Sequence, residues 1–521
     1  MDSAPILLEV FKNAFSSIAE EMGLVLQRTA FSPNIKERRD FSCAIFDKKG
    51  NLVAQAAHIP VHLGSMPESV KVAIREFKFE EGDMIVLNDP YMGGTHLPDI
   101  TLVAPFFHGG ELLFFIANRA HHSDIGGSAS GSMPLSSSIF QEGFIIPPTK
   151  LLKKGKLNEE FMKLFLRNVR TPEEREGDFK AQIMANLVGL KRLRELIEKE
   201  GVRKVVYFSE KLIEYSEKFI RARIKELPKG ECEFTDYMED DGYGNEDIKI
   251  HLKLKVNEDK LVFDFTNSDK QTKGGINAVR AITLSAVYYC VISILGKDIP
   301  INEGCFKPIE VITRKGTIVD ASFPYGVVAG NVETSQRIVD VVLGAFAKVL
   351  PEEIPAASQG TMNNVAVGGI NPDTGEPFTY YETIGGGMGA SAKGDGESAI
   401  HSHMTNTLNT PIEALEHHYP MLITEYSVRK NSGGEGMFKG GDGIVREYEF
   451  LTDVEVTVIS ERRRLSPYGL FGGNPGQTGR NIVITSEGIK EVPSKFAISL
   501  KKGDRLRIET PGGGGYLKRE K

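Results

Sequence analysis

The sequence predicts an α+β protein with mixed, largely antiparallel sheets, a helical insertion and a Gly-rich β C-terminal region. Three observations support this fold class. Residues 231–265 alternate apolar and polar positions in three runs, which is typical of an antiparallel meander. Residues 158–227 place Leu, Ile and Phe among charged residues at helical spacing, which predicts two or three long helices. From residue 426 onward, short β-rich runs alternate with glycine clusters, which indicates a barrel or stacked sheets.

Apolar spacing and turn signals also predict the elements outside these regions. Glycine and proline mark where most of them end. They are a helix over 5–30, a strand pair over 40–46 and 52–57, a helix over 65–79, a strand over 84–87, a second strand pair over 100–107 and 111–117, a buried helix over 274–295, a helix over 336–350 capped by 330–335, and a strand that enters the glycine loop at 385–396.

Composition changes near residues 150 and 230 are the best candidates for domain boundaries. They predict four parts. These are an N-terminal α/β part over 1–150, a helical insertion over 151–230, a central α+β part over 231–425 with a Gly-rich loop and a His cluster, and a β-rich part over 426–521.

Composition and charge exclude several classes of partner. The net charge of −7 lacks the basic footprint that nucleic acid requires. No apolar run has the length of a membrane span, and the N-terminus has no basic segment typical of a secretory signal. Four cysteines without a CxxC pair argue against a disulfide framework and fit a reducing cytoplasm. We therefore expect a cytoplasmic protein that binds neither nucleic acid nor membranes.

The strongest functional signal is the stretch 88–127, NDPYMGGTHLPDITLVAPFFHGGELLFFIANRAHHSDIGG. Two polar loops flank the predicted hairpin of residues 100–117. One loop carries His96 and Asp99, and the other carries His121, His122 and Asp124. Because the outer ends of a hairpin meet in space, we expect these five residues to face each other. Imidazoles and a carboxylate with open positions for water are typical of a catalytic divalent metal site.

Other residues are weaker candidates for a functional site. His58 and His62 flank Pro60 in a predicted loop, and either of them could line the active site. The segment HSHMTNTLNTPIEALEHHYP over 401–420 is a rival metal site, or its last two histidines simply end a helix. The run Arg462–Arg464 is either an anion site or a solvated basic patch.

The motifs NDPYMGGTHLPD and ANRAHHSDIGG resemble those of the hydantoinase B/oxoprolinase family. The blocks DFSCAIFDKKGNLVAQAAHIPVHLGSM and FKAQIMANLVGLKRL extend the resemblance over much of the chain. The resemblance implies a divalent metal, with Mn, Zn and Fe all open, held by His96, Asp99 and one imidazole of the AHH motif. We expect His121 rather than His122 to supply that imidazole. His122 or Asp124 would orient a ligand or act as general base.

The resemblance also implies a subunit that works with an A-type partner. That partner would bind ATP and phosphorylate the substrate, and this sequence contains no GxxxxGK[ST] loop for the nucleotide. We expect the chain to open a cyclic amide such as a hydantoin or 5-oxoproline, within a hetero-oligomer holding at least two copies of it. The alternatives are a subunit of a ketone carboxylase similar to acetone carboxylase, a non-catalytic scaffold subunit, and a stand-alone metallohydrolase.

Overall fold

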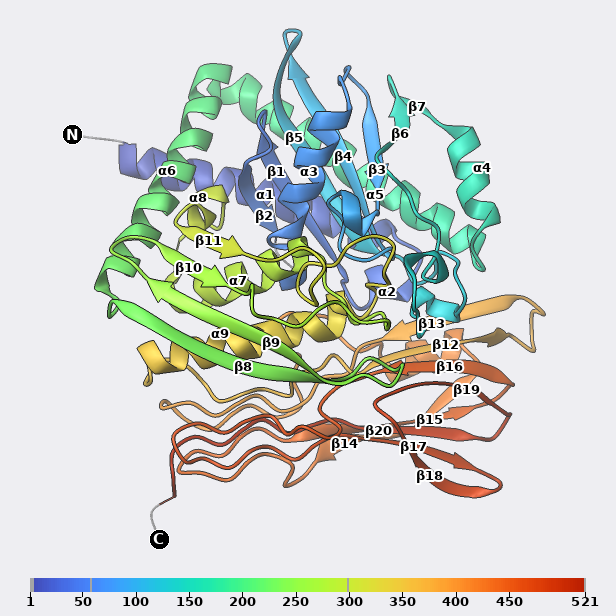
Figure 1. Ribbon diagram of the computed structural model, residues 1–521. Helices are drawn as coiled ribbons and strands as arrows, with labels where there is room; N and C mark the ends of the chain where they lie inside the picture. Colours follow the sequence, from blue (N-terminus) through green and yellow to red (C-terminus); the bar gives the residue numbers. More distant parts are fainter. Residues whose placement is uncertain (1–3, 57–58, 298, 520–521) are drawn as a thin grey trace.

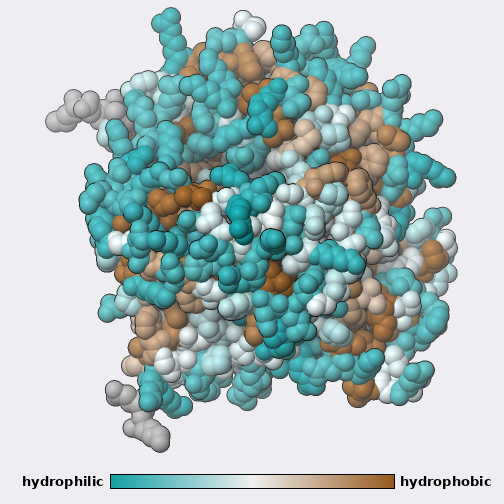
Figure 2. All heavy atoms as spheres, in the orientation of Figure 1, coloured by the Kyte–Doolittle hydropathy of each residue, from teal (hydrophilic) through white to brown (hydrophobic). Residues whose placement is uncertain are grey.

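The protein is an α+β structure with four mainly antiparallel sheets, as the sequence predicts (Figure 1). The computed structural model describes residues 4–56, 59–297 and 299–519. In these residues no helix has the length and apolar character needed to cross a bilayer. On the face that Figure 2 shows, hydrophilic side chains cover most of the surface and apolar side chains form small separate patches.

The first part of the chain builds a seven-stranded antiparallel sheet in the order β2-β1-β5-β4-β3-β6-β7. Its strands are β1 Phe41–Asp47, β2 Leu52–Ala56, β3 Met84–Leu87, β4 Asp99–His108, β5 Glu111–His121, β6 Thr149–Lys153 and β7 Lys156–Leu157. The central strands β4 and β5 form the predicted hairpin, and Leu113 to His121 are all buried. Burial on both faces explains why residues 102–107 and 112–117 are continuously apolar rather than alternating.

Helices cover this sheet on both sides. Phe11, Phe15 and Met22 of α1 pack in one apolar cluster with Ile116 of β5 and Ala185 of α5. The helix α3 belongs to a second cluster on the other side, which continues into the central part of the chain. The helices up to the end of the predicted insertion are α1 Ala4–Thr29, α2 Pro33–Lys36, α3 Ser65–Glu76, α4 Glu159–Arg167, α5 Pro172–Glu200 and α6 Val202–Glu226. Short 3-10 turns lie at η1 Pro60–His62, η2 Pro90–Met92, η3 Ser130–Ser132 and η4 Ile139–Gln141.

A four-stranded sheet, β11-β10-β9-β8, carries the central part of the chain. Its elements are β8 Gly230–Asp240, β9 Glu246–Val256, β10 Leu261–Asp264, α7 Arg280–Leu295, α8 Glu303–Phe306, β11 Ile309–Ile312 and α9 Ser335–Val349. The predicted cap over 330–335 is instead a π-helical turn, η5 Gly330–Thr334, that runs into α9. The turn packs closely against the segment before α7. A Cβ on Gly330 would meet the carbonyl oxygen of Asn277 at 1.9 Å, so there is no room for a side chain.

Two further sheets stack on one another in the C-terminal part, so the stacked alternative holds rather than the barrel. Their orders are β13-β12-β16-β19 and β14-β15-β20-β17-β18, with a shared apolar core between them. The elements are β12 Asn364–Ile370, β13 Pro377–Glu382, α10 Ile412–His418, β14 Met421–Arg429, β15 Gly443–Phe450, β16 Val454–Ile459, β17 Arg480–Thr485, β18 Gly488–Val492, β19 Lys495–Leu500 and β20 Arg505–Glu509.

Candidate metal centre

Strand pairing brings the two ends of the β4–β5 hairpin together. Asp99 begins β4, His121 ends β5, and the two residues lie opposite each other in the strand register. His96 precedes Asp99 in a loop that Asn88 fixes, because the Asn88 side-chain amide donates to the carbonyl oxygen of Leu97 at 2.8 Å. The hairpin therefore places an imidazole on each side of one carboxylate.

The donor atoms of these three residues lie close enough to hold one metal ion. Nε2 of His96 lies 3.2 Å from Oδ1 of Asp99, and Nδ1 of His121 lies 3.3 Å from the same oxygen. One donor atom from each residue lies within 4.8 Å of the other two, and all three side chains are buried. Carboxylate and imidazole together suit Zn, Mn or Fe, so the residues present fit a divalent metal.

Burial and charge set the protonation of the cluster. Burial alone would raise the pKa of Asp99, but His96 and hydrogen bonds from His121 and His62 hold that pKa well below its usual range. Burial lowers the pKa of His121. Burial would also lower the pKa of His96, yet the nearby charge and hydrogen bond of Asp99 raise it overall. A metal binds an ionised carboxylate and neutral imidazoles, so metal binding would compete with the proton that the raised pKa favours on His96.

A narrow cavity of about 20 Å³ opens beside the cluster, which is room for about one water molecule. His62 and Asp40 line it. Nε2 of His62 lies 3.5 Å from Oδ2 of Asp99, and Nδ1 of His62 lies 2.9 Å from the Ser42 hydroxyl. Asp40 supplies a second carboxylate, 4.0 Å from Nδ1 of His121. The other predicted histidine, His58, lies outside the described residues.

The structure does not bring His122 and Asp124 to this cluster. Nε2 of His122 lies 2.8 Å from Oε1 of Gln182 on α5, and burial lowers the pKa of His122 to about 4. Asp124 is fully buried and accepts hydrogen bonds from the Arg170 guanidinium at 2.8 Å and the Arg170 backbone at 2.7 Å. Both residues hold the β5 loop against the helical insertion.

Comparison with known proteins decides the family. The family model described as Hydantoinase B/oxoprolinase matches residues 4–518. The chain belongs to the hydantoinase B/oxoprolinase family. An uncharacterised protein of Methanocaldococcus jannaschii is 44% identical over 98% of this chain and 90% of its own length. A 5-oxoprolinase of Dictyostelium discoideum is 42% identical over 98% of this chain, but the match spans only 40% of that longer protein.

A solved structure extends the comparison. The crystal structure of an ATP-dependent caprolactamase from Pseudomonas jessenii has a TM-score of 0.93 and 30% sequence identity. The match covers 99% of this chain and 91% of that chain. The similarity therefore includes both the N-terminal sheet that carries the cluster and the stacked C-terminal sheets.

The second histidine group of this hydantoinase B/oxoprolinase chain does not form a metal cluster. His401 lies near Thr405 and Asn409, whereas His403 lies near Tyr289, and His417 and His418 end α10. His401 and His403 line a separate cavity of about 330 Å³. Across residues 4–56, 59–297 and 299–519, only His96, Asp99 and His121 form a group of three metal-ligating side chains.

The predicted anion site at Arg462–Arg464 is occupied by the protein's own side chains. Arg462 is buried and pairs with Asp340 at 2.6 Å and Asp236 at 2.7 Å. Arg464 pairs with Asp247 at 2.6 Å. These guanidinium groups join the segment after β16 to β8, β9 and α9.

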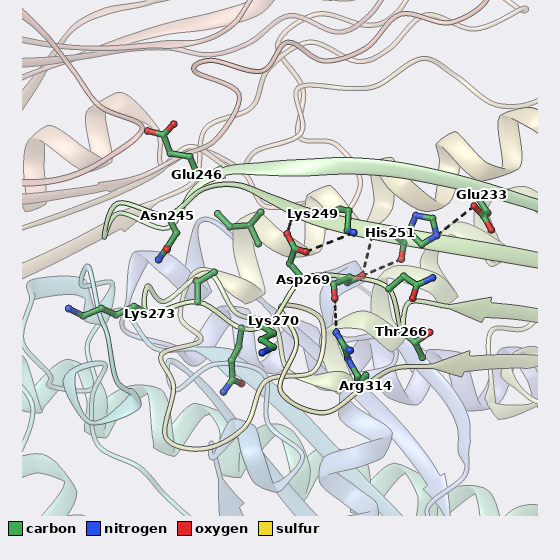
Figure 3. A pocket seen from close by; sticks show the side chains of 15 residues that line it. Glu233, Asn245, Glu246, Lys249, His251, Thr266, Asp269, Lys270, Lys273 and Arg314 are labelled. Atoms are coloured by element: carbon green, nitrogen blue, oxygen red, sulfur yellow. Dashed lines mark hydrogen bonds and ion pairs between the residues drawn. The ribbon is translucent and has the colours of Figure 1, made fainter.

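A larger cavity, of about 910 Å³, lies on the outer face of β8 and β9 and against residues 266–273 (Figure 3). Two of its charged side chains, Lys249 and Asp269, face one another. Nζ of Lys249 lies 4.0 Å from Asp269, and the Arg314 guanidinium donates to the carbonyl oxygen of Ser268 at 3.2 Å. No member of the His96–Asp99–His121 cluster lines this cavity, so it is separate from the candidate metal centre.

At least three of the residues at the cluster were not singled out as site residues by the sequence. Nδ2 of Asn331 lies 3.0 Å from Nε2 of His96, and the ring of Tyr381 stacks on His121. Asp40 is the third. Asn331 and Tyr381 come from segments more than 200 residues after the hairpin, and no local pattern connects them to it. Asp40 begins a block that resembles the family, which was an available signal.

Proposed function

We propose that this chain opens a cyclic amide that an A-type partner has activated with ATP. Supporting this, the chain belongs to the hydantoinase B/oxoprolinase family, and named relatives include a 5-oxoprolinase and an ATP-dependent caprolactamase. The match spans 40% of the Dictyostelium 5-oxoprolinase, so more than half of that protein has no counterpart in this chain. The proposed partner supplies that remaining part, including the nucleotide site.

The observation that carries the proposal is the buried cluster of His96, Asp99 and His121. We propose that these residues hold one divalent metal, whose Lewis acidity would lower the pKa of a bound water toward about 7 or polarise a carbonyl. Asp99 is ionised and lies between two imidazoles, as a ligand set requires. Asp40 and His62 line the adjoining cavity and are placed to accept a proton there.

Elemental analysis of the purified chain tests the metal centre. We expect about one equivalent of metal in the wild type and none in the double variant His96→Ala/Asp99→Ala. His122→Gln is the matched control, because it removes an imidazole of the same hairpin that faces α5 instead of the cluster. The control should retain the wild-type metal content.

Activity is then measured with the A-type protein and ATP, with 5-oxoproline and hydantoin as substrates. We expect ring opening with wild type and His122→Gln, and loss of at least about 100-fold with the double variant. Equal activity in all three proteins would support the scaffold alternative. Ring opening by the chain alone, without ATP or partner, would instead support a stand-alone metallohydrolase.

A further inference from the structure

The two histidines of the cluster are held differently. Nδ1 of His96 donates to the carbonyl oxygen of Val328 at 3.2 Å, which fixes the ring orientation. Histidines that bind metals almost always have such a partner on the second nitrogen. Nε2 of His121, in contrast, is buried and has no hydrogen-bond partner among the described residues. The Asn34 amide donates to the His121 backbone carbonyl at 2.8 Å, which fixes the main chain but does not contact the ring.

An aromatic ring, rather than a hydrogen-bond partner of Nε2, packs against the His121 imidazole. The Tyr381 ring lies 4.7 Å from the His121 ring at an interplanar angle of 12°, so the two rings are stacked. Tyr381 is 3% exposed and belongs to β13, in a sheet that does not contain the hairpin. The Arg38 guanidinium lies 5.1 Å from the Tyr381 ring and donates to its backbone carbonyl at 3.0 Å.

We propose that Tyr381 is the positioning residue of His121, and that its hydroxyl is anchored for this purpose through Asn364 to Glu333. The Tyr381 hydroxyl donates to Oδ1 of Asn364 at 2.8 Å. Nδ2 of Asn364 in turn donates to Oε1 of Glu333 at 2.7 Å. The backbone N–H of Met362 donates to the same Glu333 oxygen at 3.0 Å. The chain of contacts therefore runs from the imidazole to a fully buried carboxyl group.

Glu333 also connects this series of hydrogen bonds to His96. It lies in the π-helical turn η5, two residues after Asn331, whose amide lies 3.0 Å from Nε2 of His96. π-helical turns are rare and are found frequently at functional sites. One turn thus contacts His96 directly and reaches His121 through Asn364 and Tyr381. The spacing of the two imidazoles depends on this turn, although it lies more than 200 residues away from the hairpin.

The inference rests on the proposed metal centre, and Co²⁺ titration followed by visible absorption separates the two. Tyr381→Leu removes the stacked ring, and we expect it to weaken Co²⁺ binding at least about tenfold. Tyr381→Phe keeps the ring but releases the hydroxyl, so it should cause a smaller loss in the same direction. The d–d spectrum should change with Tyr381→Leu, because the ring plane of one ligand is no longer fixed.

Tyr380→Phe is the matched control. Tyr380 is the neighbouring residue on β13, is equally buried, and donates its hydroxyl to Glu382 at 2.8 Å, away from the cluster. It should bind Co²⁺ as the wild type does. If Tyr381→Leu does not fold, Tyr381→Phe is compared with Tyr380→Phe. Only Tyr381→Phe should lose affinity for Co²⁺ if Tyr381 positions His121.

One outcome would refute the metal centre together with the role of Tyr381, and another would refute the role of Tyr381 alone. A wild-type protein that binds no Co²⁺ refutes the metal centre and the inference with it. A wild-type protein that binds Co²⁺ with the same affinity and spectrum as both Tyr381 variants leaves the metal centre in place but refutes the role of Tyr381.

Discussion

Adjacent histidines at the end of β5 serve different purposes. Successive side chains of a strand point to opposite faces, so His121 and His122 cannot both face Asp99. The alternation predicts that one of them lies at the cluster, but it does not say which. The register decides, because Asp99 is paired with His121. His122 is left to pack on Phe179 of α5, with ring centroids 5.1 Å apart.

The variant Asp124→Asn tests whether the Asp124 carboxylate has a structural or a catalytic role. Its two oxygens accept hydrogen bonds from the side chain and backbone of Arg170. We expect Asp124→Asn to lower the free energy of unfolding by about 2 kcal/mol, since hydrogen bonds to charged groups contribute about 1.5–3 kcal/mol. Urea unfolding measures this loss, while metal content should not change. Loss of metal with unchanged stability would contradict the structural role.

Glu142 should make stability depend on pH. Burial raises its pKa to about 7, although the Ser136 hydroxyl and the backbone N–H groups of Val327 and Val328 donate to it. The folded state therefore keeps a proton that the unfolded chain releases near pH 4.5, so stability falls as the pH rises from about 4.5 to 7. The loss is about 3 kcal/mol at most.

The variant Glu142→Gln cannot ionise and keeps an oxygen for the same donors. We expect the difference in Tm between the variant and the wild type to shift in favour of the variant from pH 4.5 to pH 8. Because the two proteins differ only at residue 142, the effects of all other titratable groups on Tm cancel in this difference. A Tm difference that is independent of pH would show that Glu142 has an ordinary pKa.

At the scale of elements, the sequence predicted the hairpin and the meeting of His96, Asp99 and His121 at its ends because both are local. Apolar runs, a Gly109-Gly110 turn and polar ends lie within 40 residues, so pairing alone brings the ends together. Asn331 and Tyr381 could not be predicted in this way. Their contacts with the cluster depend on how η5 and β13 dock against the first sheet, and no periodicity encodes that docking. The π-helical turn was likewise missed because its residues also suit an ordinary cap.

The glycine-rich loops of the C-terminal part are packed backbone against backbone. A Cβ on Gly513 would meet the carbonyl oxygen of Met388 at 2.0 Å, and the Gly513 N–H donates to the carbonyl oxygen of Gly441 at 2.9 Å. Met388 cannot move without breaking its own backbone hydrogen bonds. Glycine is therefore required here for close approach rather than for turn conformation.

We expect Gly513→Ala to lower the free energy of unfolding by about 3 kcal/mol or more, as overpacking against a rigid neighbour does. Gly109→Asn is the control. Gly109 has φ +60° at the hairpin tip, a Cβ there would meet no atom within 4 Å, and Asn tolerates that conformation. The control should change stability by less than about 1 kcal/mol. Urea unfolding of both variants measures the difference, and equal losses would refute the close-packing argument.

At the scale of the whole molecule, the candidate site is assembled from both halves of the chain. The largest apolar cluster runs from Ala44 in β1 to Ile459 in β16 and includes residues of the hairpin, α7 and α9. The candidate ligands come from the β4–β5 hairpin and the loop before it, whereas Asn331 and Tyr381, which contact them, come from later parts of the chain. The predicted boundaries near 150 and 230 remain a prediction, since composition alone suggested them.

Arg38 joins these halves directly beside the cluster. It is fully buried and donates to the Thr383 hydroxyl at 2.8 Å and to the carbonyl oxygen of Leu408 at 3.3 Å, besides its contact with Tyr381. Arg38→Met keeps the length of the side chain but removes every donor. We expect a loss of about 3 kcal/mol in the free energy of unfolding, because buried acceptors lose their partners.

Arg192→Met is the matched control, because the Arg192 side chain is partly exposed and pairs with Glu21 at 2.7 Å near the surface. Solvent-accessible ion pairs contribute little to stability, so this variant should unfold close to the wild type in urea. Arg38→Met should also weaken Co²⁺ binding, since the guanidinium holds the backbone of Tyr381 against His121. Lower stability with unchanged Co²⁺ affinity would mean that Arg38 joins the two halves without contributing to the geometry of the cluster.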